Sequence, residues 1–262
     1  MTGTFRVLRW TQNSSGMPTQ YDAYGFEDNL TVSAGGTFSN NNFAATDLTD
    51  PSEQNISGSI VLPSSSYNIN GKALQLFFGD AGIDLGQDGG PSENFSYVVP
   101  SITGATFGID TYAILNAIPT SRQTYYRKRG ITGGSSGTTI NLASAPQLNI
   151  PAHNGSGIDT TTQFLWTMGS GGGICLFIVS PTNFGTAPTF YIFTANNSSS
   201  IPNLAPQGLG LPSNTSYGWR VSQIFPVASI DDAAGATFLQ QANGNTEGGQ
   251  SFSESFTFTT SP

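Results

Sequence analysis

The chain has 262 residues and a formal net charge of -8 at pH 7, so we expect two domains of ordinary size, each able to bury a core. The acidic balance argues against nucleic acid or an anionic membrane surface as the main partner, because both attract positive charge. No run of 18 apolar residues occurs, which argues against a membrane-spanning helix. A single cysteine, Cys175, excludes an intramolecular disulfide.

The composition favours an all-β protein outside the cell. Only 9% of the residues are charged, whereas the chain holds 32 Gly and 15 Pro and is 11% aromatic, a mixture typical of short strands joined by many turns. A sequence low in Lys and Glu and high in Ser, Thr, Asn and Gly is associated with secreted or cell-surface proteins. The first seven residues, MTGTFRV, show strand-like alternation and do not resemble a signal peptide. If the protein is exported, we expect this to be a mature form or a piece.

Alternating or continuous apolar residues predict strands along the whole chain, separated by Gly, Pro and Asn. The predicted strands span residues 4–10, 29–35, 56–63, 73–79, 94–100, 106–115, 138–144, 161–168, 174–180, 189–195, 216–225 and 255–260. Helical spacing occurs only at residues 229–239, which we expect to form a short helix or a loop. The fold class is therefore all-β, with tandem antiparallel β-sandwiches.

A weak internal repeat suggests the domain boundaries. MTGTFRV at residues 1–7 resembles ITGATFGI at residues 102–109, so residues 1–52 match the second half of a sandwich unit that spans residues 53–150. A third unit covers residues 155–262. Half a sandwich exposes an apolar face and unpaired strand edges. We therefore expect residues 1–52 to pack on the 53–150 unit, or to be completed by another chain or by a missing upstream segment.

An acidic loop, GDAGIDLGQDGG, holds the candidate calcium ligands Asp80, Asp84 and Asp88. Calcium prefers a cage of several oxygen ligands, and carboxylates in a Gly-rich loop are the usual source. Here, however, the spacing is four residues, without the alternating positions or the terminal bidentate Glu of a calcium loop. The sequence favours a solvated hairpin loop, with calcium as the alternative.

Half of the eight basic residues lie in SRQTYYRKR, at residues 121–129. Aromatic side chains interleaved with cations bind sugars, phosphates or single strands by stacking and charge, which makes Tyr125, Tyr126, Arg127 and Arg129 candidate ligand contacts. An acidic protein partner is a second interpretation. The first expectation is a solvated edge strand, since basic residues on an edge hinder edge-to-edge aggregation.

The residues that carry nucleophilic or metal chemistry are few. His153 is the only histidine and lies in a connector, PAHNGSG, which is a poor place to hold a base against a nucleophile. Cys175 lies in the apolar run ICLFIVS, where a buried, inert thiol is expected. One His and one Cys do not supply a zinc site, and nothing singles out a carboxylate pair. We therefore expect no cofactor and no enzymatic activity.

Two resemblances refine the fold. TTQFLWT places Phe164 and Trp166 on one face, and LPSNTSYGWRV sets a turn before alternating large residues. This order resembles a fibronectin type III domain, which implies an Ig-like sandwich with Trp166 at its centre. The resemblance also implies a tyrosine corner in which Tyr217 bonds to backbone upstream, with Leu211 before it and Trp219 beside it.

The 53–150 unit resembles the prealbumin-like, carboxypeptidase-regulatory type of sandwich found on prokaryotic surface proteins. The resemblance rests on ISGSIVLP, GKALQLFF and YVVPSITGATFGIDTYAIL. Such modules imply spacing, adhesion or stabilisation of an attached domain, and bring no catalytic residues.

These observations lead to three functional hypotheses. The first is a non-enzymatic extracellular structural protein, acting as spacer, adhesive module or filament subunit, with protein partners that include self-association by strand addition. A viral tail or fibre component is a variant of it. The second is a carbohydrate-binding module that uses exposed aromatics such as Trp10, Tyr21, Tyr24, Tyr125 and Tyr126. The third is a hydrolase with a carboxylate pair.

Overall fold

The computed structural model describes residues 2–31, 47–183, 187–234 and 247–262, and its regular structure is almost entirely β, as predicted. The first strands are β1 (Thr2–Gln12), β2 (Pro18–Thr31), β3 (Glu53–Val61), β4 (Tyr67–Phe78), β5 (Ala81–Asp88), β6 (Asn94–Pro100), β7 (Thr106–Leu115), β8 (Arg122–Ile131) and β9 (Thr138–Asn141). The later strands are β10 (Gln147–Ile150), β11 (Gly155–Ile158), β12 (Phe164–Thr167), β13 (Ile174–Pro181), β14 (Phe190–Thr194), β15 (Ser198–Ser199), β16 (Ser216–Phe225), β17 (Gly248–Phe252) and β18 (Phe256–Thr260). A 3-10 turn at Ala205–Gln207 and a short helix, α1 (Ile230–Ala234), complete the described elements; the helix lies where a short helix or a loop was expected.

Residues 2–31 form a long antiparallel hairpin of β1 and β2, not half of a sandwich. The hairpin packs on the next unit, which is one of the three expected alternatives: Met17 and Tyr21 enter the core of that unit. The Tyr21 backbone N–H donates to Glu53 Oε1 at 2.9 Å, and its hydroxyl donates to the Val98 carbonyl at 3.2 Å. Most of β2 was missed in the sequence because PTQYDAYGFEDN is too polar to stand out as a strand. The end of the strand predicted at 29–35 lies outside the described residues.

The first sandwich consists of two facing sheets. A three-stranded sheet in the order β6-β3-β9 packs against β8, β7, β4 and β5, which belong to a ten-stranded sheet. Side chains from both sheets form one buried cluster, with Ile56 and Ile140 from the small sheet and Leu74 and Ile109 from the large one. Alternating apolar residues cause this packing, because successive side chains of a strand point to opposite faces.

The second sandwich has the sheet β10-β12-β15 on one side and the strands β14, β13, β16 and β18 on the other. Its core is aromatic: Phe164 lies 4.9 Å from Phe177 and 5.0 Å from Trp219, measured between ring centroids. Because β10 pairs with β12, it belongs to this sandwich. The boundary therefore falls between β9 and β10, and not at residues 150–155 as the sequence suggested.

One strand, β17, joins the two sandwiches into a single sheet. Along one edge β16 pairs with β13; along the other it pairs with β18 over residues 216–219 and with β17 over residues 222–225. The opposite edge of β17 pairs with β8 of the first sandwich, from Gly248 with Arg127 to Phe252 with Gln123. Strand pairing therefore continues without a break from β5 at one end to β14 at the other.

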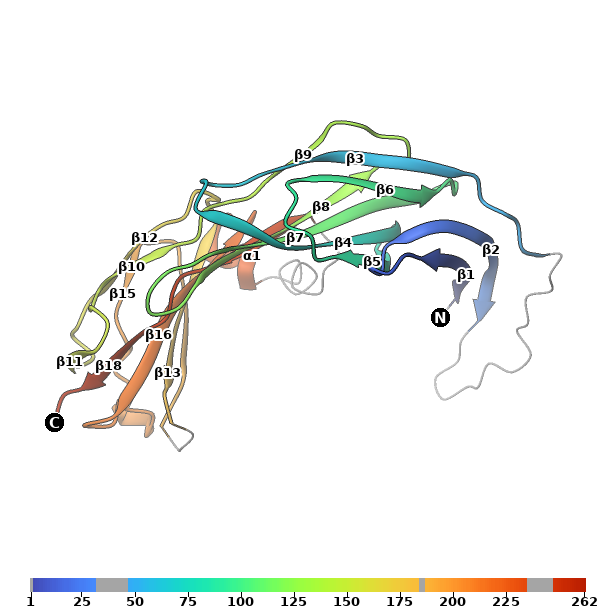
Figure 1. Ribbon diagram of the computed structural model, residues 1–262. Coiled ribbons are helices and arrows are strands. Elements are labelled where there is room, and N and C mark those ends of the chain that lie inside the picture. Colours follow the sequence, from blue (N-terminus) through green and yellow to red (C-terminus); the bar gives the residue numbers. More distant parts are fainter. Residues whose placement is uncertain (1, 32–46, 184–186, 235–246) are drawn as a thin grey trace.

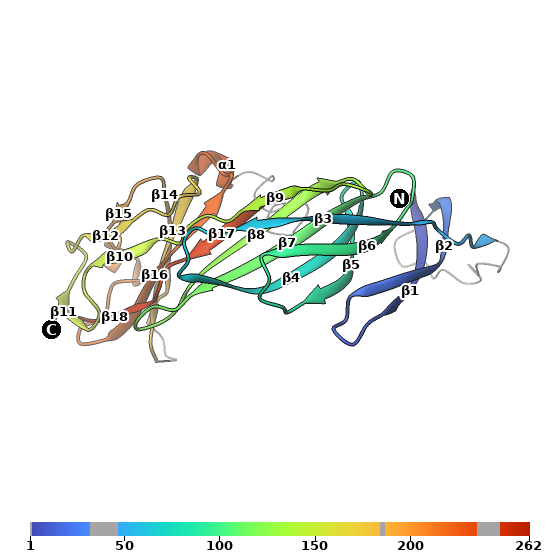
Figure 2. The same ribbon diagram turned by 45° about the horizontal axis from the view of Figure 1, so that its top comes forward.

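The molecule is elongated and curved, with the β1–β2 hairpin at one end and the carboxyl terminus at the other (Figure 1). The order of hairpin, first sandwich and second sandwich along the long axis is also clear after rotation by 45° (Figure 2). None of the helices in the described part of the chain has the length and hydropathy of a membrane-crossing segment.

Candidate functional site

The basic segment forms β8, which is an interior strand and not the expected solvated edge. It pairs with β7 on one side and with β17 on the other. The expectation failed because the second neighbour, β17, comes from more than 100 residues further along the chain. A cationic strand thus lies in the middle of the large sheet, at the junction of the two sandwiches.

Each basic side chain of β8 has a partner within the molecule. Arg127 forms a two-point ion pair with Asp110 on β7, with Nε to Oδ1 at 2.5 Å. The hydrogen bonds that Arg127 donates to Asp110 are the main reason that the pKa of Arg127 is raised. Arg129 donates to the Gly79 carbonyl at 3.0 Å and stacks on Phe77, with its guanidinium carbon 3.6 Å from the ring centroid. These two predicted ligand contacts are therefore engaged in the fold.

Arg122 and Glu254 form an ion pair that ties the two sandwiches together. Arg122 Nε lies 2.5 Å from Glu254 Oε2, and the Glu254 side chain is 3% exposed. The other carboxylate oxygen accepts the backbone N–H of Leu148 on β10 at 3.1 Å. One buried carboxylate therefore bonds to a strand of each sandwich. Such a pair is costly to break, since the remaining charge would be buried without a partner.

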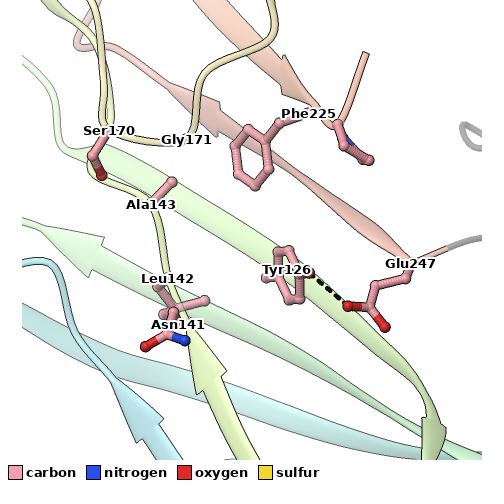
Figure 3. Close-up of a pocket in the computed structure, with 9 residues that line it drawn as sticks. Tyr126, Asn141, Leu142, Ala143, Ser170, Gly171, Phe225 and Glu247 are labelled. Carbon is pink, nitrogen blue, oxygen red and sulfur yellow. Dashed lines mark hydrogen bonds between the residues drawn. The ribbon is translucent and has the colours of Figure 1, made fainter. Parts of the chain in front are cut away.

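A groove of about 570 Å³ opens beside this junction (Figure 3). Its lining comes from β8, from the ends of β9 and β16 with the residues after them, from the loop before β13 and from the residue before β17. The lining residues are Tyr126, Asn141, Leu142, Ala143, Ser170, Gly171, Phe225, Pro226 and Glu247. Tyr126 and Phe225 stack with ring centroids 6.2 Å apart and form an aromatic wall. The amide of Asn141 and the hydroxyl of Ser170 add polar groups, so the groove combines an aromatic surface with hydrogen-bonding groups.

Glu247 is the charged centre of the groove. It accepts hydrogen bonds from the Tyr126 hydroxyl at 2.9 Å, from Lys128 Nζ at 2.9 and 3.0 Å, and from the Arg129 backbone N–H at 3.3 Å. Burial disfavours the charged carboxylate, but these donors outweigh burial and the pKa of Glu247 is lowered. Burial and the adjacent carboxylate raise the pKa of Tyr126 to about 12. The ionised Glu247 accepts hydrogen bonds and the neutral Tyr126 phenol donates one, and the lowered pKa makes the carboxylate a weak base.

The three carboxylates of the acidic loop are not brought together. Asp80 lies in the β4–β5 turn, and Asp84 and Asp88 lie along β5. A strand rises about 3.3 Å per residue, so a spacing of four separates Asp84 from Asp88 by about 13 Å. In the described part of the chain, no three His, Cys, Asp or Glu side chains gather as a metal site would require.

Asp88 has a structural partner in Lys72. The Lys72 ammonium is fully buried and lies 3.2 Å from Asp88 Oδ2, and it also donates to the carbonyls of Gly90 and Ser92. Asp88 accepts a further bond from the Tyr97 hydroxyl at 2.9 Å. Burial works against ionisation of Asp88, yet the hydrogen bonds and the Lys72 charge lower its pKa. The carboxylate thus neutralises a buried cation.

The aromatics expected to stack on sugars are mostly covered. Tyr21 and Tyr24 are buried, at 1% and 9% exposure, so neither is the exposed aromatic that was expected. Trp10 is half-buried and packs against the first core. Tyr125 and Tyr126 are half-buried as well. Of these five, only Tyr126 lines the groove.

The residues quoted for the fibronectin resemblance lie in the second core. Trp166, Tyr217 and Trp219 are buried, and Leu211 packs against the same cluster. Tyr217 stacks on Phe258 with ring centroids 5.6 Å apart. The Tyr217 side chain is therefore part of this core.

The hydrogen bond expected of a tyrosine corner is not formed. Within the described residues, the Tyr217 hydroxyl is buried and has no hydrogen-bond partner. Thr260 on the last strand holds the corner instead of Tyr217. The Thr260 hydroxyl donates to the Pro212 carbonyl at 2.6 Å and accepts a hydrogen bond from the Thr215 N–H at 2.8 Å. The backbone groups of the turn are thus satisfied from another strand.

Cys175 is placed as expected, whereas His153 lies within the second sandwich and not in a connector between the two sandwiches. Cys175 is fully buried, and burial raises the pKa of its thiol to about 11, which is an inert environment. His153 lies in the turn between β10 and β11, where Nδ1 accepts the Thr257 backbone N–H at 3.1 Å. Neither lies in the groove.

Sequence reasoning missed Glu247, Glu254 and Phe225 as junction residues. The two carboxylates flank GGQSF, a segment too short and too polar to be recognised as a strand. The Gly-Gly pair at the start of this segment was the only feature of the sequence that could have indicated a close crossing of strands. A Cβ at Gly249 would lie 2.4 Å from the Tyr125 carbonyl oxygen and from the Phe225 ring, so this strand crossing requires glycine.

Comparison with known proteins identifies no family. No family model matches the chain, and no curated protein matches it. Among solved structures, the crystal structure of a DUF3823 family protein from Parabacteroides merdae shows a likeness with 13% sequence identity and a TM-score of 0.23, over 80% of this chain and 100% of that one. At this TM-score the likeness supports no conclusion about fold or function.

Proposed function

We propose that this protein is a non-enzymatic structural spacer of tandem β-sandwiches, working outside the cell or at a cell surface. The observation that carries the proposal is the sheet that continues through β17 from one sandwich to the other. Tandem domains joined by a linker alone move relative to each other by default. A shared sheet and the Arg122–Glu254 pair restrict that motion, and a spacer needs a fixed distance between its ends.

The use of the charged groups supports a structural role. Arg122, Arg127, Lys128 and Lys72 each pair with a carboxylate of the same chain. An active site keeps groups poised for substrate, with pKa values tuned towards the working pH. Here the shifts follow from existing pairs and from burial: hydrogen bonds and lysine partners lower the pKa values of Asp88 and Glu247, and burial raises that of Cys175. The fibronectin-like and prealbumin-like resemblances point the same way, as does the Ser, Thr, Asn and Gly-rich composition.

The distance between the sandwiches tests the spacer. Spin labels at Asn55→Cys on β3 and Ser213→Cys before β16 report on it, since both positions are exposed and the native Cys175 is buried. Pulsed electron resonance should give one narrow distance distribution. A broad distribution, equal to that of two domains on a flexible linker, would overturn the proposal. Biotinylation of intact cells that make the protein tests its place outside the cell.

Glycan binding in the junction groove is a second candidate. The stacked Tyr126 and Phe225 beside Asn141, Ser170 and Glu247 favour it, because sugar sites combine an aromatic face with amide, hydroxyl and carboxylate groups. A glycan array identifies a ligand, and titration calorimetry then compares variants. We expect Asn141→Ala to weaken binding about tenfold, through loss of a hydrogen bond, and Asn55→Ala on β3 to leave it unchanged. A blank array removes this candidate.

A further inference from the structure

The edge strand β14 differs from the edge strands β1 and β5. It pairs with β13 and, within the described residues, with no other strand. Alternate backbone N–H and C=O groups of such a strand point away from the sheet. β1 carries Arg6 and Arg9, and β5 carries Asp84 and accepts a bond from the N-terminal hairpin at its Leu85 carbonyl. Charges and cover are the usual protection of an edge, and β14, with the sequence FYIFT, has no charge.

The sequence around β14 is also uncharged, and Arg220 on β16, opposite Ile178, lies one strand beyond β13. Residues 160–219 contain no Asp, Glu, Lys, Arg or His, although the whole chain has a net charge of -8. Two copies of an acidic protein repel each other over most of their surface. At this edge they approach without like charges facing each other. The pairing of β14 with β13 has no register shift, so no bulge twists the edge away from a partner.

The strand complements itself when two copies run antiparallel. With Ile192 opposite Ile192 of the second copy, Tyr191 faces Phe193 twice, and these two side chains are 66% and 37% exposed. Their outer face continues onto Leu176 and Ile178 of β13, which are their cross-strand neighbours. Opposed aromatic pairs are among the stabilising cross-strand pairs of a sheet. Phe190 and Thr194, which point to the core, oppose each other on the inner face.

We infer that two copies of this chain pair through β14, antiparallel and centred on Ile192, so that the large sheet continues from one molecule into the next. The occupant of this edge is thus a second copy, and the contact is isologous, which closes at two molecules and does not propagate. This differs from the sequence-based expectation, in which residues 1–52 received another chain. The pairing goes beyond the spacer function and does not rest on it, because either would hold without the other.

Cysteine cross-linking tests the register. Residues directly opposite in an antiparallel pair have Cα atoms about 4.5–5.5 Å apart, which suits a disulfide, whereas diagonal neighbours lie about 7–8 Å apart. We expect Ile192→Cys to form a covalent dimer on mild oxidation. Tyr191→Cys or Phe193→Cys alone should not, but a mixture of the two should. If Tyr191→Cys alone formed covalent dimers in the same yield as Ile192→Cys, the proposed register would be overturned.

A charge exchange tests the interface without disturbing the core. Sedimentation should show a monomer–dimer equilibrium for the native chain, and the double variant Y191K/F193K should weaken it at least about tenfold, since like charges then face each other. The Y191E/F193E variant should also dimerise weakly. An equimolar mixture of the Y191K/F193K and Y191E/F193E variants should form heterodimers. Equal melting temperatures show that both variants remain folded. A native chain that stays monomeric at millimolar concentration would overturn the proposal.

Discussion

Single residues of this protein illustrate how burial turns an ordinary side chain into a structural requirement. Lys72 places its ammonium in the first sandwich at 0% exposure, where an unpaired charge would be expensive. Asp88 and two backbone carbonyls supply the compensation. Asp88, which the sequence offered only as an alternative calcium ligand, thus neutralises the buried Lys72.

Replacing Asp88 by Asn should lower the free energy of unfolding by about 1.5–3 kcal/mol, because a hydrogen bond to a charged group is lost and Lys72 stays buried. Urea denaturation measures the change. Asp84→Asn is the matched control, since Asp84 is exposed and accepts one bond from Gln75; its effect should stay within about 0.5 kcal/mol. Equal effects of the two variants would contradict the role of Asp88.

The corner before β16 gives a second prediction at this scale. Tyr217→Phe should leave stability unchanged or raise it by up to about 1 kcal/mol, because the hydroxyl is buried without a partner. Thr260→Val should cost about 1–3 kcal/mol, since it leaves the Thr215 N–H and the Pro212 carbonyl without the Thr260 hydroxyl. Thr259→Val, at an exposed neighbour, is the control in the same thermal melts. A large loss for Tyr217→Phe would restore the expected tyrosine clasp.

Among the elements, β17 has the greatest effect on the architecture for its length. It is five residues long, yet it forms the bridge between β16 and β8. Its partner strand β8 lies more than 100 residues away along the chain. Such pairings are slow to form because a long loop must close first.

Gly249→Val should disrupt this bridge. The added side chain would meet the Tyr125 carbonyl oxygen, and overpacking of this kind costs about 1–3 kcal/mol. Faster hydrogen exchange at β17 and β8 amides, together with a broader distance distribution between the two spin labels, is the expected result. Gly3→Val, where a Cβ meets nothing within 4 Å, should change neither. Unchanged exchange in Gly249→Val would show that β17 does not couple the sandwiches.

The elements also show how far sequence reasoning reaches. Strands with clear alternation, β7 and β16, were predicted at their observed positions, whereas only the second half of β4 was predicted. β2 and β17 were missed because their polar residues hide the pattern. Lys128 and Arg122 of β8 seemed free because their partners Glu247 and Glu254 lie 119 and 132 residues away. Pairing between such distant segments depends on topology that local pattern does not encode.

At the scale of the whole molecule, ionisable groups set the pH range of stability. Asp88 and Glu247 have lowered pKa values, so the stability they contribute is complete above the unfolded carboxyl pKa of about 4 and is lost as the pH falls through their folded values. Tyr126 has a pKa raised to about 12. Its contribution is complete below the unfolded tyrosine pKa of about 10 and is lost as the pH rises through the folded value.

Urea midpoints should therefore be level between about pH 5 and pH 9 and decline on both sides. Glu247→Gln should flatten part of the acid decline and leave the alkaline decline mostly intact. Absorbance of tyrosinate near 295 nm, recorded with the alkaline series, should rise for the buried tyrosines only as the protein unfolds. Full ionisation of all tyrosines near pH 10 in a folded protein would contradict the assignment.

The strand β17 also determines how this protein can be divided. A fragment that stops before residue 247 would leave β8 with a bare edge, and a fragment that starts after β9 would carry β17 without the strand it completes. Neither sandwich is therefore an independent domain. Recombination or engineering that treats the two sandwiches as separable cassettes should yield insoluble pieces, whereas insertions placed at the tips of hairpins far from the seam should be accepted.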